Sequence, residues 1–422
     1  MDHKIIENAY GIAKDRYAEF EVNPDEIIKR LKEIPISVHC WQGDDVTGFE
    51  NPDQGLSDGG IQVTGNYPGR ARNFAELTSD YEKVFSLVPG SHRVNLHAIY
   101  GDFAEKKRDR NELVPEQFDK WINWARKLGV KLDFNPTLFS HPKASSGFTL
   151  SSINPEIRKF WVEHINCCRE IASYMGKKQG SPCICNLWIP DGSKDITVSR
   201  FKYRELLKSS LDEIYEKTYS DSNLKDAVEG KLFGIGSEYF VVGSHDFYLS
   251  YTSQNDNVML CMDMGHYHPT EDVGDKISSV LQFQDELLLH VSRGVRWDSD
   301  HVVIMNDHLM SVAHEIIRSE AISKSYIALD FFDASINRLG AWITGIRSTQ
   351  KALLRAMLEP TKILRDYEEN GELFQRLSLL QEMKNMPWTA IWDYFCLKND
   401  VPVAYEWIEE VEKYEGEILK NR

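Results

Sequence analysis

The stretch VMLCMDMGHYHP, residues 258–269, decides the fold that we expect for this chain. It begins with an unbroken apolar run, as in a strand that is buried on both faces of a parallel sheet. The run ends in Asp263, and His266 follows three residues later, where such a strand would turn. The same order, a short apolar run that ends at a polar or aromatic side chain, recurs at His39, His97, Asn135, Trp188, His290 and Asp330.

Eight candidate strands of this kind lie along the chain, over residues 35–40, 93–99, 130–135, 183–189, 226–233, 258–263, 287–292 and 326–330. Helical patterns separate them, such as one that starts at Pro115 and stops at Gly129, and a longer one that ends at Gly176. Strands joined by helices form a parallel sheet, and eight of them predict an α/β fold, the (β/α)8 TIM barrel. Such a barrel gathers the carboxyl ends of its strands at one mouth. The stretch 302–305 is a candidate for a ninth strand.

Helical sequence flanks the predicted barrel on both sides. We expect an N-terminal helical segment over residues 1–34, the barrel over 35–345 and a C-terminal helical extension over 346–422. The extension carries more apolar positions than one barrel helix can bury. We therefore expect it to contact a neighbouring subunit in a homotetramer or a similar assembly.

The composition excludes several classes of protein. The 422 residues carry a net charge of −16, and 42% are hydrophobic, which is typical of a globular protein and not of a disordered chain. The acidic balance argues against nucleic-acid binding, which needs clustered Lys and Arg. No apolar run approaches the ~20 residues that span a bilayer, and the polar N-terminus has no signal-peptide core. The seven cysteines lack zinc or redox spacing, so we expect reduced thiols in a cytoplasmic protein.

The polar residues at the predicted mouth are of the kind that binds metal ions. Carboxylates and imidazoles are ligands of hard and borderline divalent ions. One such residue alone is more commonly a helix cap or a buried structural group. Several acids in one mouth, however, repel one another unless a cation neutralises them, and two ions neutralise them better than one. The candidate ligands are Asp263, His266, His290, Asp298, Asp300 and Asp330.

The fifth predicted strand adds another acid, but its sequence offers two choices. Glu229 and Lys231 lie on the same face of this strand, whereas Glu238 follows at the far end of the next segment. The residues alone do not choose between the two glutamates. Trp41 and Trp188 lie beside the polar set, where flat rings can stack on the C–H surface of a sugar and exclude water.

Longer segments of the chain resemble the L-rhamnose isomerase family, from about residue 35 to the C-terminus. The most specific are RWDSDH (296–301) and FFDASINR (331–338). The others are VHCWQGDD, NLHAIYGD, LDFNPTLFSHPKASSGFTLS, NLWIPDGSKD, DMGHYHPTE and KALLRAMLEPT. The resemblance implies a barrel enzyme related in architecture to xylose isomerase, usually tetrameric and manganese-dependent. Its activity would be the aldose–ketose isomerisation of L-rhamnose to L-rhamnulose.

The resemblance also implies two metal positions, filled by Mn²⁺ or, as other candidates, Zn²⁺ or Co²⁺. The residues that match the ligands of a catalytic metal are His266, Asp298 and Asp300. The residues that match the ligands of a second, structural or substrate-binding metal are Glu229, Asp263, His290 and Asp330. The family's E-x-K pattern favours Glu229 and Lys231 over Glu238.

The remaining site residues follow from the same resemblance. Trp41 and Trp188 match aromatic walls around the sugar, and His97 matches a residue near the ring oxygen. Metals that polarise O1 and O2 together would let a hydride pass from C2 to C1 in a dry pocket. Asp300 would orient a water that moves the proton between the two oxygens, and Lys231 would hold the carbonyl oxygen.

Three other functions stay open on the sequence alone. A metal-dependent sugar epimerase on the same barrel would use two carboxylates for proton transfer at C3. A hydrolase of phosphoesters needs cations around the phosphate, and only Lys231, Arg293 and Arg296 offer them. A sugar-binding protein without catalysis would not need the Asp298 and Asp300 pair.

Overall fold

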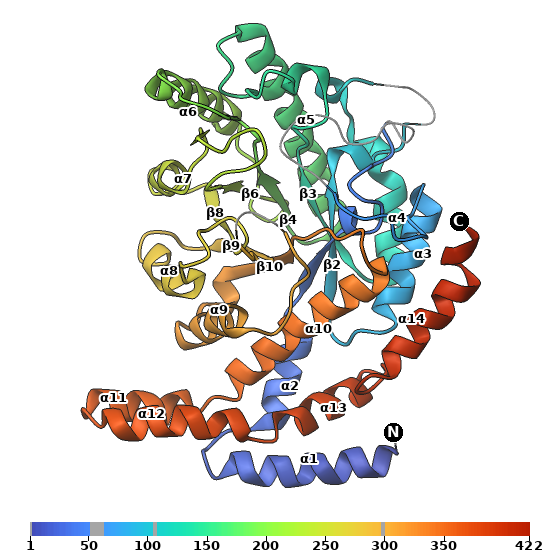
Figure 1. Cartoon of the computed structure of the whole chain (residues 1–422), viewed down its shortest axis with the longest axis vertical. Helices are drawn as coiled ribbons and strands as arrows, with labels where there is room; N and C mark the ends of the chain where they lie inside the picture. The colour runs from blue at the N-terminus through green and yellow to red at the C-terminus, as the bar shows by residue number, and fades with distance from the viewer. Residues whose placement is uncertain (1, 51–62, 104–107, 297–299) are drawn as a thin grey trace.

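The computed structural model of the chain describes residues 2–50, 63–103, 108–296 and 300–422. Its centre is a closed barrel of parallel strands in the order β1–β10–β9–β8–β6–β4–β3–β2 (Figure 1). The barrel strands are β1 Ile36–His39, β2 His92–His97, β3 Lys131–Asn135, β4 Cys183–Leu187, β6 Leu224–Glu229, β8 Val258–Asp263, β9 Leu287–Val291 and β10 Ser325–Leu329. A small antiparallel sheet, β5 Gly192–Ser193 with β7 Phe240–Val241, lies outside the barrel. The predicted (β/α)8 barrel is confirmed.

A helix follows each barrel strand and packs outside the barrel (Figure 1). These helices are α3 Phe74–Phe85, α4 Asp119–Leu128, α5 Pro155–Gln179, α6 Arg200–Glu216, α7 His245–Thr252, α8 Val273–Val280, α9 Asp307–Arg318 and α10 Arg338–Met357. Gly129 ends α4 as predicted, because its φ of 79° is the left-handed conformation that a helix C-terminus favours. No helix within the described ranges is long and apolar enough to cross a membrane.

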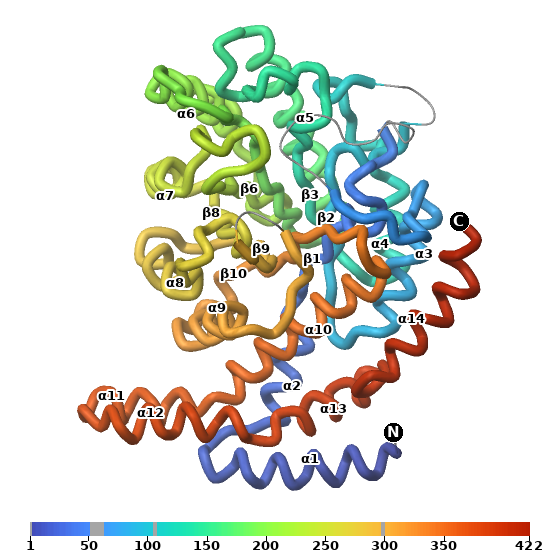
Figure 2. Tube along the Cα trace, viewed as in Figure 1, coloured from blue at the N-terminus to red at the C-terminus, as the bar shows by residue number. Residues whose placement is uncertain are grey.

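The two ends of the chain form further helices outside the barrel, as predicted. They are α1 His3–Ala18, α2 Pro24–Glu33, α11 Thr361–Glu369, α12 Leu373–Glu382, α13 Trp388–Lys398 and α14 Glu406–Glu417. Figure 2 shows α1 running beside α13. The rings of Tyr10 and Tyr394 stack there with their centroids 3.8 Å apart.

The register of the barrel brings the polar ends of neighbouring strands close together. Glu229 of β6 pairs with Cys261 of β8, and Asp263 pairs with His290 of β9. Side chains alternate along a strand, so residues two positions before these acids also point inward and fill the barrel beneath the mouth. The barrel closes where β1 meets β10, through only the pairs Ile36–Ile327 and Ser37–Ala328.

Two strand predictions are wrong in detail. The fifth barrel strand covers 224–229 rather than 226–233. It ends before Gly230, which packs so closely against His245 that a Cβ there would lie 2.8 Å from the His245 ring. The stretch 302–305 adds no ninth strand to the barrel. Val302 and Val303 are buried in the core, and the β-pairing described there is a single bridge between Arg293 and His301.

The end of α5 also differs from the prediction. The helix continues past Gly176 to Gln179 and ends at Gly180, whose φ is 62°. A Cβ on Gly176 would lie 1.8 Å from the carbonyl oxygen of Asn223. This glycine therefore permits close packing inside the helix and does not mark its end.

Candidate metal centre

The carboxyl ends of the barrel strands surround one cavity of about 330 Å³. Side chains that lie far apart in the sequence meet in its wall, as the barrel prediction required. The predicted strand-end residues that line it are His97, Asn135, Trp188, His290 and Asp330. His39 does not reach the cavity, because its side chain is fully buried and its Nε2 accepts a hydrogen bond from the Phe331 N–H at 3.4 Å.

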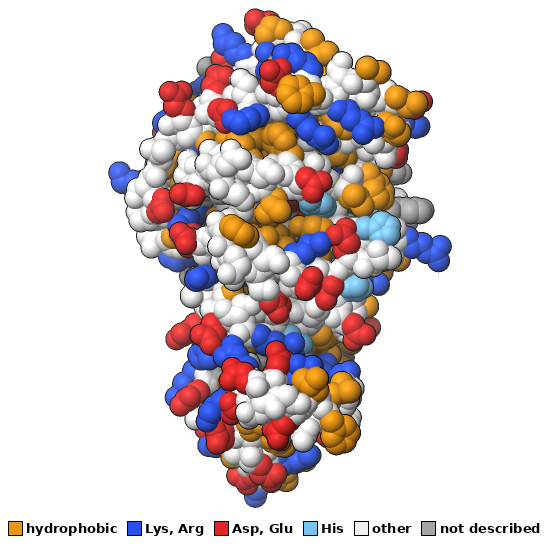
Figure 3. Space-filling model, turned by 90° about the vertical axis from the view of Figure 1, so that its left-hand side faces the viewer, with side chains coloured by type: hydrophobic (Ala, Val, Ile, Leu, Met, Phe, Trp, Pro, Cys, Tyr) orange, Lys and Arg blue, Asp and Glu red, His pale blue; other side chains and the backbone are white. Residues whose placement is uncertain are grey.

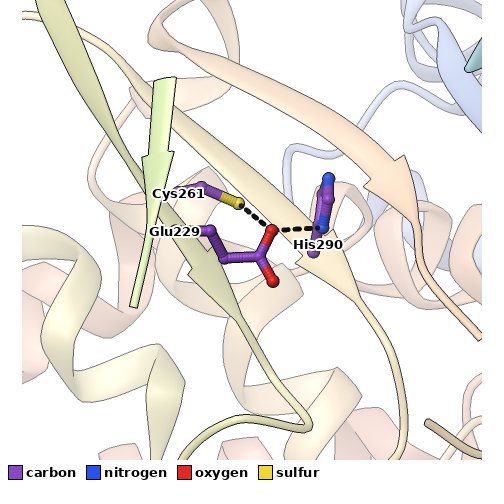
Figure 4. Close-up of side chains that lie close together, drawn as sticks. All are labelled: Glu229, Cys261 and His290. Carbon is purple, nitrogen blue, oxygen red and sulfur yellow. Dashed lines mark hydrogen bonds and ion pairs between the residues drawn. The ribbon is translucent and has the colours of Figure 1, made fainter. Parts of the chain in front are cut away.

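The first group of candidate ligands consists of Glu229, Asp263, His290 and Asp330, whose ligand atoms all lie within 4.8 Å of one another. His290 is at its centre. Its Nδ1 lies 3.1 Å from Glu229 Oε2, 3.2 Å from Asp330 Oδ2 and 3.6 Å from Asp263 Oδ2. Figure 4 shows the Glu229 carboxylate between the His290 ring and the thiol of Cys261. We call this set the inner cluster.

The second group, the outer cluster, consists of Asp263, His266 and Asp300, again within 4.8 Å. The Nε2 atom of His266 lies 3.8 Å from Asp300 Oδ1, and its Nδ1 lies 2.9 Å from Glu229 Oε1. The two clusters therefore share Asp263 and also touch through His266 and Glu229. Asp298 lies outside the described residues, so its role as a ligand stays a prediction.

The structure brings Glu229, and not Glu238, to this site. Glu238 is exposed, and its carboxylate accepts a hydrogen bond from the N–H of Gly236 at 3.2 Å. Glu229 is 3% exposed and ends β6 at the level of the inner cluster.

Polar neighbours orient the carboxylates of the inner cluster. Asn186 Nδ2 donates a hydrogen bond to Glu229 Oε2 at 2.5 Å, and Trp41 Nε1 donates one to Asp330 Oδ1 at 2.9 Å. Asp263 Oδ1 accepts hydrogen bonds from Ser292 Oγ and from the N–H of Gly265, both at 2.6 Å. Asn186 and Ser292 were not predicted as site residues from the sequence. The inward alternation of β4 and β9 is the signal that points to them, since each lies two residues after an inward-facing residue of its strand.

The charges of the inner cluster fit a divalent cation. Burial alone raises the pKa of Glu229, but the imidazoles of His290 and His266 outweigh this effect and hold the pKa well below its ordinary value. Burial lowers the pKa of His290, but the anionic groups around it outweigh burial and raise the pKa well above its ordinary value. The acids therefore require positive charge among them. His290 Nε2 has no hydrogen-bond partner within the described chain, and Asp263 Oδ2 and His290 Nδ1 face only each other and the other carboxylates of this cluster, so these atoms are suited to bind a metal ion.

Aromatic rings and the Lys231 ammonium also line the cavity. The Trp41 and His97 rings meet edge to face with their centroids 4.8 Å apart, and Lys231 Nζ lies 4.7 Å from the centre of the Trp188 ring. Burial, assisted by the Arg110 guanidinium, lowers the pKa of His97 to about 3, so its imidazole is neutral near pH 7. Its Nδ1 lies 3.1 Å from Thr137 Oγ1.

Solved structures share the barrel only distantly with this chain. An L-ribulose 3-epimerase matches with a TM-score of 0.49 and 10% identity, covering 76% of this chain and 95% of that chain. A D-psicose 3-epimerase from Clostridium cellulolyticum H10 matches with a TM-score of 0.46 and 14% identity, covering 68% of this chain and 95% of that chain. Similarities of this size carry no argument about function.

Sequence relatives are much closer. An L-rhamnose isomerase of Bacteroides thetaiotaomicron is 54% identical over 419 residues, which is 99% of each chain. One of Rhodopirellula baltica is 52% identical over 417 residues, 99% of this chain and 97% of the relative. The model of the family described as L-rhamnose isomerase (RhaA) matches residues 4–422. With its barrel, its two clusters of candidate ligands and these matches over nearly its whole length, the chain belongs to the L-rhamnose isomerase family.

Proposed function

We propose that this protein is an aldose–ketose isomerase that converts L-rhamnose to L-rhamnulose with two divalent ions per subunit. The observation that carries the proposal is the pair of ligand clusters that share Asp263 on one side of an aromatic-walled cavity. Relatives that are 50–54% identical bear the name L-rhamnose isomerase. We expect Mn²⁺ in the native enzyme, with Zn²⁺ or Co²⁺ as other candidates, because nitrogen and oxygen ligands suit all three.

The residues divide into metal ligands and groups that handle the sugar. His266 and Asp300, with Asp298, would hold the catalytic ion, and the inner cluster would hold the structural or substrate-binding ion. When bound, such ions act as Lewis acids that polarise the sugar oxygens O1 and O2. The Lys231 ammonium, beside Trp188, would hold the carbonyl oxygen, and the Asp300 carboxylate would guide the proton between O2 and O1.

The cavity wall favours a dry site. The Trp41 ring is 4% exposed and is fixed by its hydrogen bond to Asp330, so it stays in place while the sugar binds. Trp41 and Trp188 would exclude water from C1 and C2. The neutral His97 can donate or accept a hydrogen bond at the ring oxygen without adding charge.

The acids in the wall favour a hydride shift over proton transfer. Those that line the cavity in the described ranges are Glu229, Asp300, Asp330 and Asp333. The first three belong to the clusters, and Asp333 Oδ1 accepts hydrogen bonds from the N–H and the hydroxyl of Ser335. A carboxylate that is occupied in this way is a poor base at C2. We therefore place the epimerase second. A phosphoester hydrolase is less favoured still, because Arg293 donates to the Val302 carbonyl oxygen at 2.9 Å.

The isotope experiment tests the proposal. The full-length protein is incubated with L-rhamnose and Mn²⁺ in D₂O, and with substrate that carries deuterium at C2, with a chelator-treated sample as the control. We expect L-rhamnulose that gains almost no solvent deuterium at C1, carries the C2 label at C1, and does not form in the chelated sample. Substantial solvent deuterium at C1 would overturn the hydride shift and favour proton transfer, and ketose formation without metal would overturn the role of the ions.

We also infer that the enzyme is a cytoplasmic homotetramer. All seven cysteines are free, as expected in a reducing compartment. Figure 3 shows a small group of hydrophobic side chains at one edge of the lower part of the molecule, among many charged side chains. Helix α12 has no buried residue, and its large apolar side chains Leu373, Phe374 and Leu377 are 55%, 78% and 59% exposed. Apolar side chains in such numbers on one helix favour burial against another subunit.

A further inference from the structure

A cysteine lies against the inner cluster and has no task in the proposed reaction. Cys261 precedes Asp263 by two positions in β8, so both side chains point into the barrel. Its thiol is 1% exposed and donates a hydrogen bond to Glu229 Oε2 over 3.6 Å. In Figure 4 the sulfur and the His290 ring both contact the same oxygen of the Glu229 carboxylate.

The three side chains offer a set of donor atoms with the spacing of one metal site. Cys261 Sγ, a Glu229 oxygen and a His290 ring nitrogen all lie within 4.8 Å of one another. The separation from Glu229 Oε2 is 3.6 Å to the sulfur and 3.1 Å to His290 Nδ1. Ligands at about 2.0–2.3 Å from a tetrahedral ion lie roughly 3.3–3.8 Å apart, so small movements would close this set around one ion.

We propose that Cys261, Glu229 and His290 form a binding position for soft, thiophilic divalent ions such as Cd²⁺, beneath the position proposed for the second metal. The inference rests on that proposed position, because the two share Glu229 and His290. A hard ion such as Mn²⁺ prefers the oxygens of Asp263 and Asp330, whereas a soft ion gains more from sulfur. An ion held at Cys261 would therefore take two ligands away from Mn²⁺.

The chemistry of this step is a ligand exchange without oxidation or reduction. The S–H bond of Cys261 breaks, the sulfur–metal bond forms, and the proton passes to the buffer. A bound Mn²⁺ leaves as the hydrated ion.

The chain offers a matched control on a neighbouring strand. Cys185 of β4 is also buried, at 2% exposed, but it packs among the apolar residues between barrel and helices. It belongs to no group of candidate metal ligands among the described residues. Cys261→Ser and Cys185→Ser thus remove the same atom from two barrel strands, and only one of them adjoins the inner cluster.

The test is a titration of the metal-free, full-length protein with Cd²⁺, followed by the sulfur-to-cadmium charge-transfer absorbance in the ultraviolet, as a difference spectrum against the metal-free protein. We expect a band that saturates at one Cd²⁺ per chain in the wild type and in Cys185→Ser. In Cys261→Ser the band should be absent and Cd²⁺ affinity lower by about 10- to 100-fold. No band in the wild type, or a band that persists in Cys261→Ser, would overturn the proposal.

Two further measurements complete the test. With Mn²⁺ already bound, Cd²⁺ should release one Mn²⁺ per chain, seen as the electron paramagnetic resonance signal of the free ion, and a band without release would overturn the shared ligands. If circular dichroism shows that Cys261→Ser is unfolded, cadmium NMR of the wild type decides the question, because sulfur ligation shifts the resonance downfield and a shift typical of oxygen and nitrogen alone would refute it. Isomerase activity with Mn²⁺ is measured separately, so the proposed function and this site can fail independently.

Discussion

The hydrogen bond from Trp41 to Asp330 allows a sharp test of how the cavity wall supports the metal site. Trp41 and Trp188 line the same cavity, but only the Trp41 indole donates to a candidate ligand, at 2.9 Å. The indole N–H of Trp188 has no hydrogen-bond partner among the described residues. Replacing each by Phe is the same chemical change in the same pocket, so the difference between the variants isolates the hydrogen bond.

The expected difference follows from the kind of bond that is lost. A hydrogen bond to a charged acceptor contributes about 1.5–3 kcal/mol, and about 1.4 kcal/mol corresponds to a factor of ten in affinity. Asp330 is held by this donor with its Oδ2 toward His290. We therefore expect Trp41→Phe to weaken Mn²⁺ binding by about 10- to 100-fold. Trp188→Phe should change it by less than about threefold, because no ligand loses a donor.

Isothermal titration calorimetry of the metal-free proteins with Mn²⁺ measures both affinities, and circular dichroism checks that both variants are folded. Equal losses of affinity in the two variants would show that ring packing, and not the hydrogen bond, supports the site. A larger loss in Trp188→Phe would refute the reasoning outright.

Three more predictions follow from the site and the surface. His266→Ala should abolish isomerisation while circular dichroism in metal-containing buffer stays as in the wild type, because ligands at the mouth contribute little to the core; loss of the fold would contradict this. Phe374→Glu should lower the molar mass measured by light scattering, whereas Phe201→Glu, which is 84% exposed on α6, should leave it unchanged; the same mass for both would exclude α12 from the interface. Burial raises the pKa of Asp44 to about 7, so the folded chain keeps a proton that the unfolded chain releases near pH 4. Stability should therefore fall by about 4 kcal/mol between pH 4 and 7 and then level off, and Asp44→Asn should remove that part of the slope in urea titrations; an unchanged slope would count against the raised pKa.

The strand-end pattern was enough to predict the barrel and much of the site. The strand over 258–263 has the predicted bounds, because an unbroken apolar run ends there in an acid and a turn. Asp263, His290 and Asp330 meet as expected, since parallel strands in a closed barrel must present their carboxyl ends together. This part of the prediction needed only the positions of the polar residues at the ends of the apolar runs and the alternation of strands with helices.

The parts that the sequence could not predict depend on register and packing. The choice between Glu229 and Glu238 depended on where the fifth barrel strand ends. The strand ends at Glu229, but apolar residues continue in the sequence beyond it, so the pattern alone does not mark this end. Asn186 reads as an ordinary polar residue, and Cys261 as one more member of an apolar run. Their proximity to Glu229 arises from the pairing of neighbouring strands, which one sequence does not specify.

The short seam between β1 and β10 has a consequence for how the protein is made. The pairs Ile36–Ile327 and Ser37–Ala328 join the first barrel strand to the last, so the barrel cannot close until β10 has left the ribosome. Until then the nascent sheet has an unpaired strand edge, which is prone to aggregation. Closing the barrel also costs loop-closure entropy, because the two strands that pair lie far apart in the sequence. The high contact order of this last pairing makes closure a late and slow event in folding. The contact of α1 with α13 joins the first helix of the chain to one that follows β10, so it too must wait until that later part of the chain has been synthesised.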